Sequence, residues 1–166
     1  MRARIVVAAL GTAALLATGP TAMAGKPVIE TIPVDEVDTI DCGGFVLEDH
    51  VFGTIKSRFT ENADGSARDL VGIRLRHIVT NPQTEESLRS NDVGVDKVSI
   101  HPDGSATVMQ IGLIGNFRIP GQGVIAHESG VSVLFFTDPG DQEPDVLFEA
   151  GPKDDLDAAL CEALAP

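Results

Sequence analysis

The chain has 166 residues, with 12 Lys and Arg against 25 Asp and Glu, so its net charge is -13. The bases are scattered along the sequence, which argues against nucleic acid and anionic membrane as partners, because phosphate binding requires clustered cations. Trp and Tyr are absent, and this argues against a carbohydrate-binding face, which normally uses amphipathic rings. A cationic partner, or simple solubility outside the cell, fits the charge better.

The first 24 residues have the layout of a secretory signal peptide. Arg2 and Arg4 precede an apolar run over 5–17, and the small residues at 22–24 fit a cleavage site. We therefore expect cleavage after Ala24 and a secreted, extracellular protein. Its mature charge would be -15, from 10 bases (12 less Arg2 and Arg4) and 25 acids. The run is shorter than the roughly 20 residues that a membrane span needs, so we expect no membrane span.

Two cysteines, Cys42 and Cys161, are present. Exported proteins meet an oxidising compartment, where two cysteines normally pair. The sequence therefore predicts a Cys42–Cys161 disulfide that closes most of a single domain over 42–166. The alternative, a reactive or metal-binding thiol, lacks a CxxC spacing or a neighbouring His.

Residues 25–41 contain prolines and five acids, and they are expected to form an N-terminal arm that adds at most an edge strand. After this arm, apolar residues recur with a period of two, which indicates strands with one buried face. Residues 83–92 are polar and fit either a helical turn or an exposed edge. Turn residues at 62–66, 101–104 and 120–123 predict hairpins. The predicted strands are 45–59, 69–80, 93–100, 105–119, 124–127, 131–137 and 145–150.

The end of the chain breaks this pattern. Apolar residues recur there at helical spacing and predict a short α-helix over about 154–164. Strands joined by local hairpins, without helices between them, predict an all-β antiparallel up-and-down meander. Such a meander must protect its edges, so we expect it to close as a barrel, with a β-sandwich as the alternative. The helical stripe consists of Leu156, Ala159, Leu160, Ala163 and Leu164.

Two of the four histidines are candidate ligand-binding residues. His77 and His127 share the apolar phase of their strands, so both could point into a barrel and bind a ligand or move a proton. The alternative is that each hydrogen-bonds a neighbour. His50 and His101 are expected to be solvated. Zinc-protease, serine-hydrolase and EF-hand patterns are missing. The acidic loop at 138–144, with Asp138, Asp141 and Glu143 and the following Asp145, fits a solvated loop better than a calcium site. We expect no metal or cofactor and assign no catalytic residue.

A resemblance rests on the signal peptide, the acidic strands, the PGQG turn at 120–123 followed by VIAHESG and VSVLFFTD, and a late cysteine in a short helix. In these features the chain resembles small secreted β-rich proteins of unassigned function from high-GC Gram-positive bacteria. In architecture alone, the expected barrel is similar to lipocalin-like and allene-oxide-cyclase-like barrels. The resemblance implies a secreted β domain and supplies no catalytic residues.

Three functions remain open from the sequence. The leading hypothesis is a non-enzymatic secreted module that binds a small apolar ligand or a partner surface, with a solvent-reaching cavity lined by one parity of the strands. The first alternative is a barrel isomerase or cyclase, which requires His77 and His127 to line one pocket. The second alternative is a structural cell-surface interaction protein with an exposed apolar patch. The sequence leaves the oligomeric state open.

Overall fold

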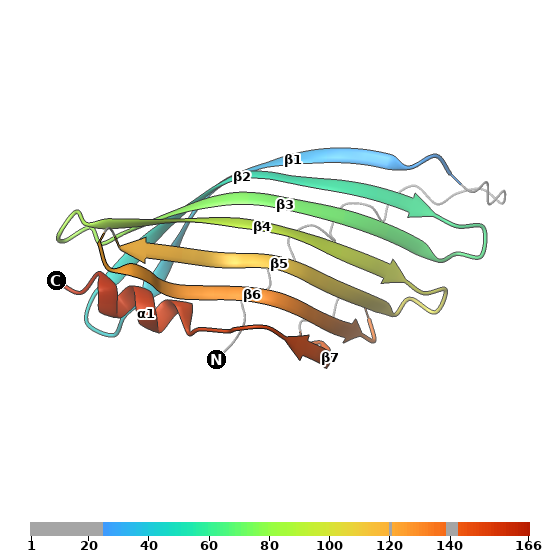
Figure 1. The fold of residues 1–166 in the computed structure, drawn as a ribbon. Helices are drawn as coiled ribbons and strands as arrows, with labels where there is room; N and C mark the ends of the chain where they lie inside the picture. Colours follow the sequence, from blue (N-terminus) through green and yellow to red (C-terminus); the bar gives the residue numbers. More distant parts are fainter. Residues whose placement is uncertain (1–24, 120, 139–142) are drawn as a thin grey trace.

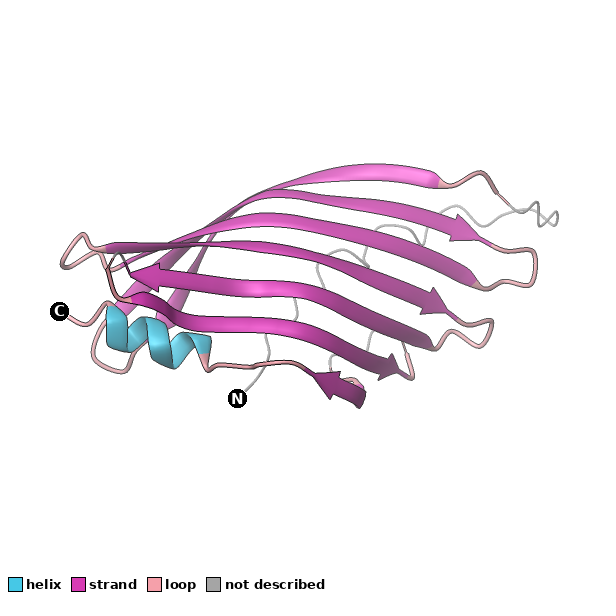
Figure 2. Cartoon of the chain, viewed as in Figure 1, coloured by secondary structure: helices cyan, strands magenta, loops and turns pink. Residues whose placement is uncertain are grey.

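The structure is a computed structural model that describes residues 25–119, 121–138 and 143–166. The predicted signal peptide lies outside the described residues. Seven strands form one sheet in sequence order, and each strand pairs antiparallel with the next (Figures 1 and 2). The predicted all-β antiparallel meander with one short helix is confirmed. The elements are β1 (Val28–Asp41), β2 (Val46–Glu61), β3 (Ala67–Thr80), β4 (Ser87–Ile100), β5 (Ala106–Ile119), β6 (Gly123–Phe136), β7 (Asp145–Ala150) and α1 (Leu156–Ala163).

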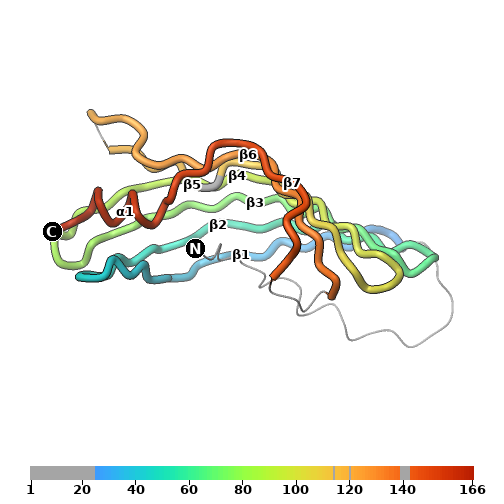
Figure 3. Tube along the Cα trace, turned by 90° about the horizontal axis from the view of Figure 1, so that it is seen from below, coloured from blue at the N-terminus to red at the C-terminus, as the bar shows by residue number. Residues whose placement is uncertain are grey.

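The described strands do not close into a barrel. β1 and β7 are the two outer strands and do not pair with each other. Closure requires hydrogen bonding between the first and last strands, and here a 14-residue β1 would have to match a six-residue β7. Figure 3 shows the result as a long, bent, open sheet. The barrel prediction is therefore not confirmed, whereas an open antiparallel sheet remains compatible with the β-sandwich alternative.

Three element boundaries differ from the sequence prediction. The N-terminal arm is a full edge strand, β1, that pairs with β2 along its whole length. Residues 87–92, most of the polar segment 83–92, belong to β4, because their backbone pairs with β3 although their side chains are polar. The two strands expected at 124–127 and 131–137 form one strand, β6, which continues through Gly130.

The same pair of side-chain hydrogen bonds stabilises the β2–β3 and β4–β5 hairpin turns. Asp64 and Asp103 each accept hydrogen bonds from the backbone N–H and the hydroxyl of the serine two residues later. These hydrogen bonds to Ser66 and Ser105 lower the pKa of both carboxyl groups. The turns are thus fixed by Asp-Gly-Ser sequences, as the turn residues predicted.

Helix α1 covers one end of one face of the sheet. Asp155 caps it by accepting a hydrogen bond from the backbone N–H of Ala158. The disulfide between Cys42 and Cys161 is present, with 5.5 Å between the Cα atoms, and it joins the β1–β2 turn to the helix. The buried core beneath the helix combines four strands with α1; its members are Leu47, Val79, Leu88, Phe117, Leu160 and Leu164.

The two faces of the sheet can be named from this core. We call the face against α1 the covered face and the opposite one the open face. Side chains alternate between them, and exposure follows: along β4, Leu88 and Ser90 are buried, whereas Arg89, Asn91 and Val93 are exposed. Among the described residues, no helix has the length and apolarity needed to cross a bilayer.

Glycines allow close backbone approach where the sheet bends. At Gly130, φ is +149° and an added Cβ would lie 2.0 Å from the carbonyl oxygen of Ala150. We expect Gly130→Ala to lower the free energy of unfolding by about 2 kcal/mol, because both the conformation and the contact exclude a side chain. Gly72→Ala is the matched control: its Cβ would meet only the Lys56 carbonyl oxygen, at 3.8 Å. Urea unfolding of both variants checks this; equal stability would contradict it.

Candidate functional site

The bases that are scattered in sequence gather on the open face. The register places seven bases on the same face of β2, β3 and β4: Lys56, Arg58, Arg68, Arg74, Arg76, Arg89 and Lys97. Arg118 of β5 joins them. Every Lys and Arg of the seven strands is in this set of eight, and Glu48 is the single acid that the same register places on the open face of β2–β6. Bases that are scattered along the sequence are therefore gathered on one face of the folded chain.

The other acids of β2–β6 occupy the covered face. They are Asp49, Glu61, Asp69, Asp92, Asp96 and Glu128, which the register places with the residues under α1 and their continuation along the strands. Burial raises the pKa of Asp96 and of Glu128. Strands β2–β6 are thus polarised across the thickness of the sheet, with a cationic open face, whereas β1 places Asp35 and Asp41 on that same face.

A one-residue bulge in β5 brings Arg118 to the open face. The register with β6 shifts between Ile114 and Asn116, at Gly115, where φ is +71°. Two side chains of β4 hold the bulge: Asp92 Oδ1 accepts from the backbone N–H of Gly115, and Ser90 Oγ accepts from that of Asn116. The extra residue reverses the alternation that follows.

This bulge also corrects a sequence prediction. Strict alternation along the predicted strand 105–119 would place the five apolar residues at odd positions on one face; they are Met109, Ile111, Leu113, Phe117 and Ile119. In the structure Phe117 and Ile119 pack in the core under α1, whereas Leu113 lines a depression on the open face.

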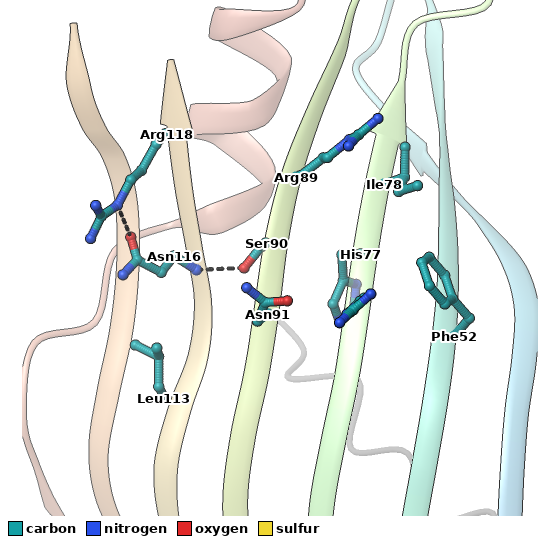
Figure 4. A pocket seen from close by; sticks show the side chains of 10 residues that line it. Phe52, His77, Ile78, Arg89, Ser90, Asn91, Leu113, Asn116 and Arg118 are labelled. Atoms are coloured by element: carbon teal, nitrogen blue, oxygen red, sulfur yellow. Dashed lines mark hydrogen bonds between the residues drawn. The ribbon is translucent and has the colours of Figure 1, made fainter. Parts of the chain in front are cut away.

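This depression, of about 600 Å³, lies on the open face near the helix-covered end of the sheet. Phe52 of β2, Leu113 of β5 and Ile78 of β3 form its apolar part. Asn91 and Asn116 supply amide groups (Figure 4). His77 and Ser90 also border the depression, although the register places their side chains on the covered face. Three guanidinium groups from three neighbouring strands surround it: Arg76, Arg89 and Arg118.

The positive charge of this depression is not neutralised by its lining, which contains no carboxylate. Arg118 donates from Nε to Asn116 Oδ1 at 3.2 Å, a hydrogen bond to a neutral amide. None of the three arginines forms an ion pair with another described residue. Arg76, Arg89 and Arg118 are all exposed, so their donors are available to a ligand.

An exposed apolar strip continues from the depression along β4 and β5. Cross-strand pairs Val93–Leu113 and Val95–Ile111 lie side by side, and Met109 follows beside Lys97. Val93 is 55% exposed and Ile111 38% exposed. A second depression, lined in part by Phe52, Asn91 and Val93, adjoins the first and links it to the strip. Single exposed apolar residues are ordinary, whereas a continuous exposed strip is a candidate binding surface.

His77 lies on the covered face, between two carboxylates. Its Nδ1 is 2.8 Å from Asp49 Oδ2 and its Nε2 is 3.1 Å from Asp92 Oδ2, and all three side chains are at most 17% exposed. Burial lowers the pKa of His77, but the hydrogen bonds and charges of Asp49 and Asp92 outweigh burial and raise it to about 10. The ring is therefore a cation at neutral pH, and both its nitrogens are occupied.

The structure does not bring His77 and His127 together. His127 lies on the open face, next to the buried Ala126, and its Nε2 is 3.0 Å from Ser129 Oγ. The other two histidines are on the surface, as expected: His50 Nε2 is 2.6 Å from Asp35 Oδ1, and His101 Nε2 is 3.2 Å from Thr107 Oγ1. The described residues contain no cluster of His, Cys, Asp and Glu arranged to hold a metal ion.

Sequence reasoning missed the arginine depression, although part of the signal was present. Arg74 and Arg76 alternate with apolar residues on β3, which places them on one face of that strand. Their position beside Arg89 depends on the β3–β4 register, and the position of Arg118 on this face depends on the bulge in β5.

Comparison of the chain with models of known families, with characterised proteins and with solved structures finds no match, so its function has to be argued from this geometry.

Proposed function

We propose that the protein is a secreted, non-enzymatic binding module that holds a small ligand with an apolar part in the depression on the open face of its sheet. The observation that carries this proposal is the lining: Phe52, Ile78 and Leu113 offer apolar contacts, and side chains with free donors surround them. Ligand sites typically combine an apolar surface with a few placed polar groups. In this proposal the ligand lies on one face of an open sheet and not inside a barrel.

The same geometry gives the enzyme alternative less support. A proton-moving histidine needs a nitrogen that is free to exchange a proton with substrate. Both nitrogens of His77 hydrogen-bond to carboxylates. The ring keeps its positive charge well above neutral pH, because its pKa is about 10. His127 is on the opposite face of the sheet, so the two rings do not line one pocket.

Filling the depression tests the proposed function. Asn91 is exposed and lines both adjoining depressions, so Asn91→Trp should occupy the space that a ligand needs. Ser99→Trp, near the other end of β4 and on the same face, is the matched control. Native mass spectrometry of the protein purified from a secreting host should show a bound small molecule in the wild type and in Ser99→Trp, but not in Asn91→Trp.

Two kinds of result would contradict a ligand site in this depression. The proposal is wrong if the wild type carries no bound molecule and if amide NMR signals of β3–β5 do not move when apolar compounds of positive, neutral and negative charge are added. Equal ligand occupancy in Asn91→Trp and Ser99→Trp would place the ligand elsewhere on the molecule. Circular dichroism of both variants verifies that each retains the β-sheet.

A further inference from the structure

We infer that the ligand is a single-chain anionic amphiphile, with its acidic head among Arg76, Arg89 and Arg118 and its hydrocarbon chain on the strip that runs from Leu113 to Met109. This inference rests on the proposed function and adds the charge and shape of the ligand. Carboxylate and phosphate heads share the chemistry that three guanidinium groups recognise.

The head position follows from charge and geometry. The three arginines come from β3, β4 and β5, and their strands hold them around one depression. They have no carboxylate partner among the described residues. Asp35 and Glu48, which the register places on the same face, do not line the depression, and Asp35 bonds His50. Asp49 and Asp92 are engaged by His77 on the covered face. An anionic head would supply the missing counter-charge, whereas a cationic head would be repelled.

The chain position follows from the register. Leu113 lines the depression, and the strip continues through the pair Val95–Ile111 to Met109. Val131 and Val133 of β6 widen it, since they pair with Ile111 and Met109. Four residues along a strand give the strip a length of roughly 13 Å. A flexible apolar chain can follow such a surface, whereas a compact ring would cover only the depression.

A single molecule fits better than a bilayer or a nucleic acid. A membrane or polyanion faces the whole chain, whose net charge is -13, and long-range repulsion opposes its approach. For an acidic head within hydrogen-bond reach of the arginines, the electrostatic energy of binding comes mainly from these three cations, because charges beyond about 8 Å are largely screened at physiological salt. Most acids of β2–β6 are on the other face, and Asp35, Asp41 and Glu48, which the register places on the open face, do not line the depression.

Matched probes test the inference. Isothermal titration with laurate and with dodecyl phosphate, below their micelle-forming concentrations, should show binding. Dodecanol and dodecyltrimethylammonium should bind at least tenfold more weakly, and acetate, which lacks the chain, should not bind. Arg89→Gln and Arg118→Gln should each weaken laurate binding about tenfold, the loss expected for one hydrogen bond to a charged group. Arg68→Gln, on the same face but outside the depression, should bind laurate as the wild type does.

Each outcome separates this inference from the proposed function. Equal affinity for laurate and dodecanol, or an equal effect of Arg68→Gln and Arg89→Gln, overturns the anionic head while leaving a ligand site in the depression. Equal affinity for acetate and laurate overturns the chain position. Cosedimentation with phosphatidylglycerol vesicles together with no binding of laurate would mean that the face docks on a membrane. No probe binding to the depression would defeat both proposals.

Discussion

Replacing Cys42 and Cys161 by alanine is expected to lower the free energy of unfolding by about 5 kcal/mol. The bridge spans 119 residues, and in the chain-entropy model the closure of a loop of that size restricts the unfolded chain by about that amount. The bridge also holds α1 against Leu47 and Val79, so its loss should expose the core at this end of the sheet. Urea unfolding of the wild type and of the double variant, monitored by circular dichroism, measures the difference in free energy of unfolding.

A reductant provides the control for this prediction. Wild-type protein in reducing buffer should unfold at the same urea concentration as Cys42→Ala/Cys161→Ala in either buffer. A double variant as stable as the oxidised wild type would show that the helix is held by packing alone. Two free thiols in the wild type under oxidising conditions would contradict the bridge itself.

Replacing His77 by glutamine should make the stability of the protein less dependent on pH. The folded-state pKa of His77, about 10, lies above its ordinary value of 6.5, so the imidazolium contributes its full stabilisation below pH 6.5. That contribution is lost as the pH rises from 6.5 to 10. At 1.36 kcal/mol per pKa unit the upper limit is about 5 kcal/mol, and we expect about 3 kcal/mol after relaxation of the partly buried pairs.

The measurement is the difference in unfolding free energy between the wild type and His77→Gln, from pH 6 to pH 10. The difference should be largest at pH 6 and should shrink toward pH 10, since glutamine cannot balance Asp49 and Asp92 with a positive charge. His101→Gln, at an exposed turn, should show no such trend. An imidazole NMR signal of His77 that titrates between pH 6 and pH 7 would contradict the buried cation.

The sequence was sufficient for the elements whose pattern is local. Alternation in 69–80 and the Asp-Gly-Ser turns predicted β3 and the hairpins, and the spacing from Leu156 to Leu164 predicted α1 within two residues. The compartment argument also paired Cys42 with Cys161 correctly. In these cases neighbouring residues alone determine the conformation, so one sequence carries the information.

The remaining features depend on non-local geometry. Whether a meander closes depends on the pairing of β1 with β7, which no local pattern encodes. The position of Arg118 depends on the Gly115 bulge, whose stabilising contacts come from Ser90 and Asp92 on another strand. Parity within separate strands suggested that His77 and His127 share an interior, yet in an open sheet they lie on opposite faces. The candidate site was therefore largely unpredictable from one sequence.

The central claim is that the open face, at Arg76, Arg89 and Arg118, is the binding surface. Covalent arginine labelling with phenylglyoxal, read out by peptide mass spectrometry with and without laurate, tests it most directly. We predict that laurate protects these three arginines and leaves Arg58 and Arg68, on the same face, as reactive as before. Equal protection of all five, or protection of none, would contradict the account.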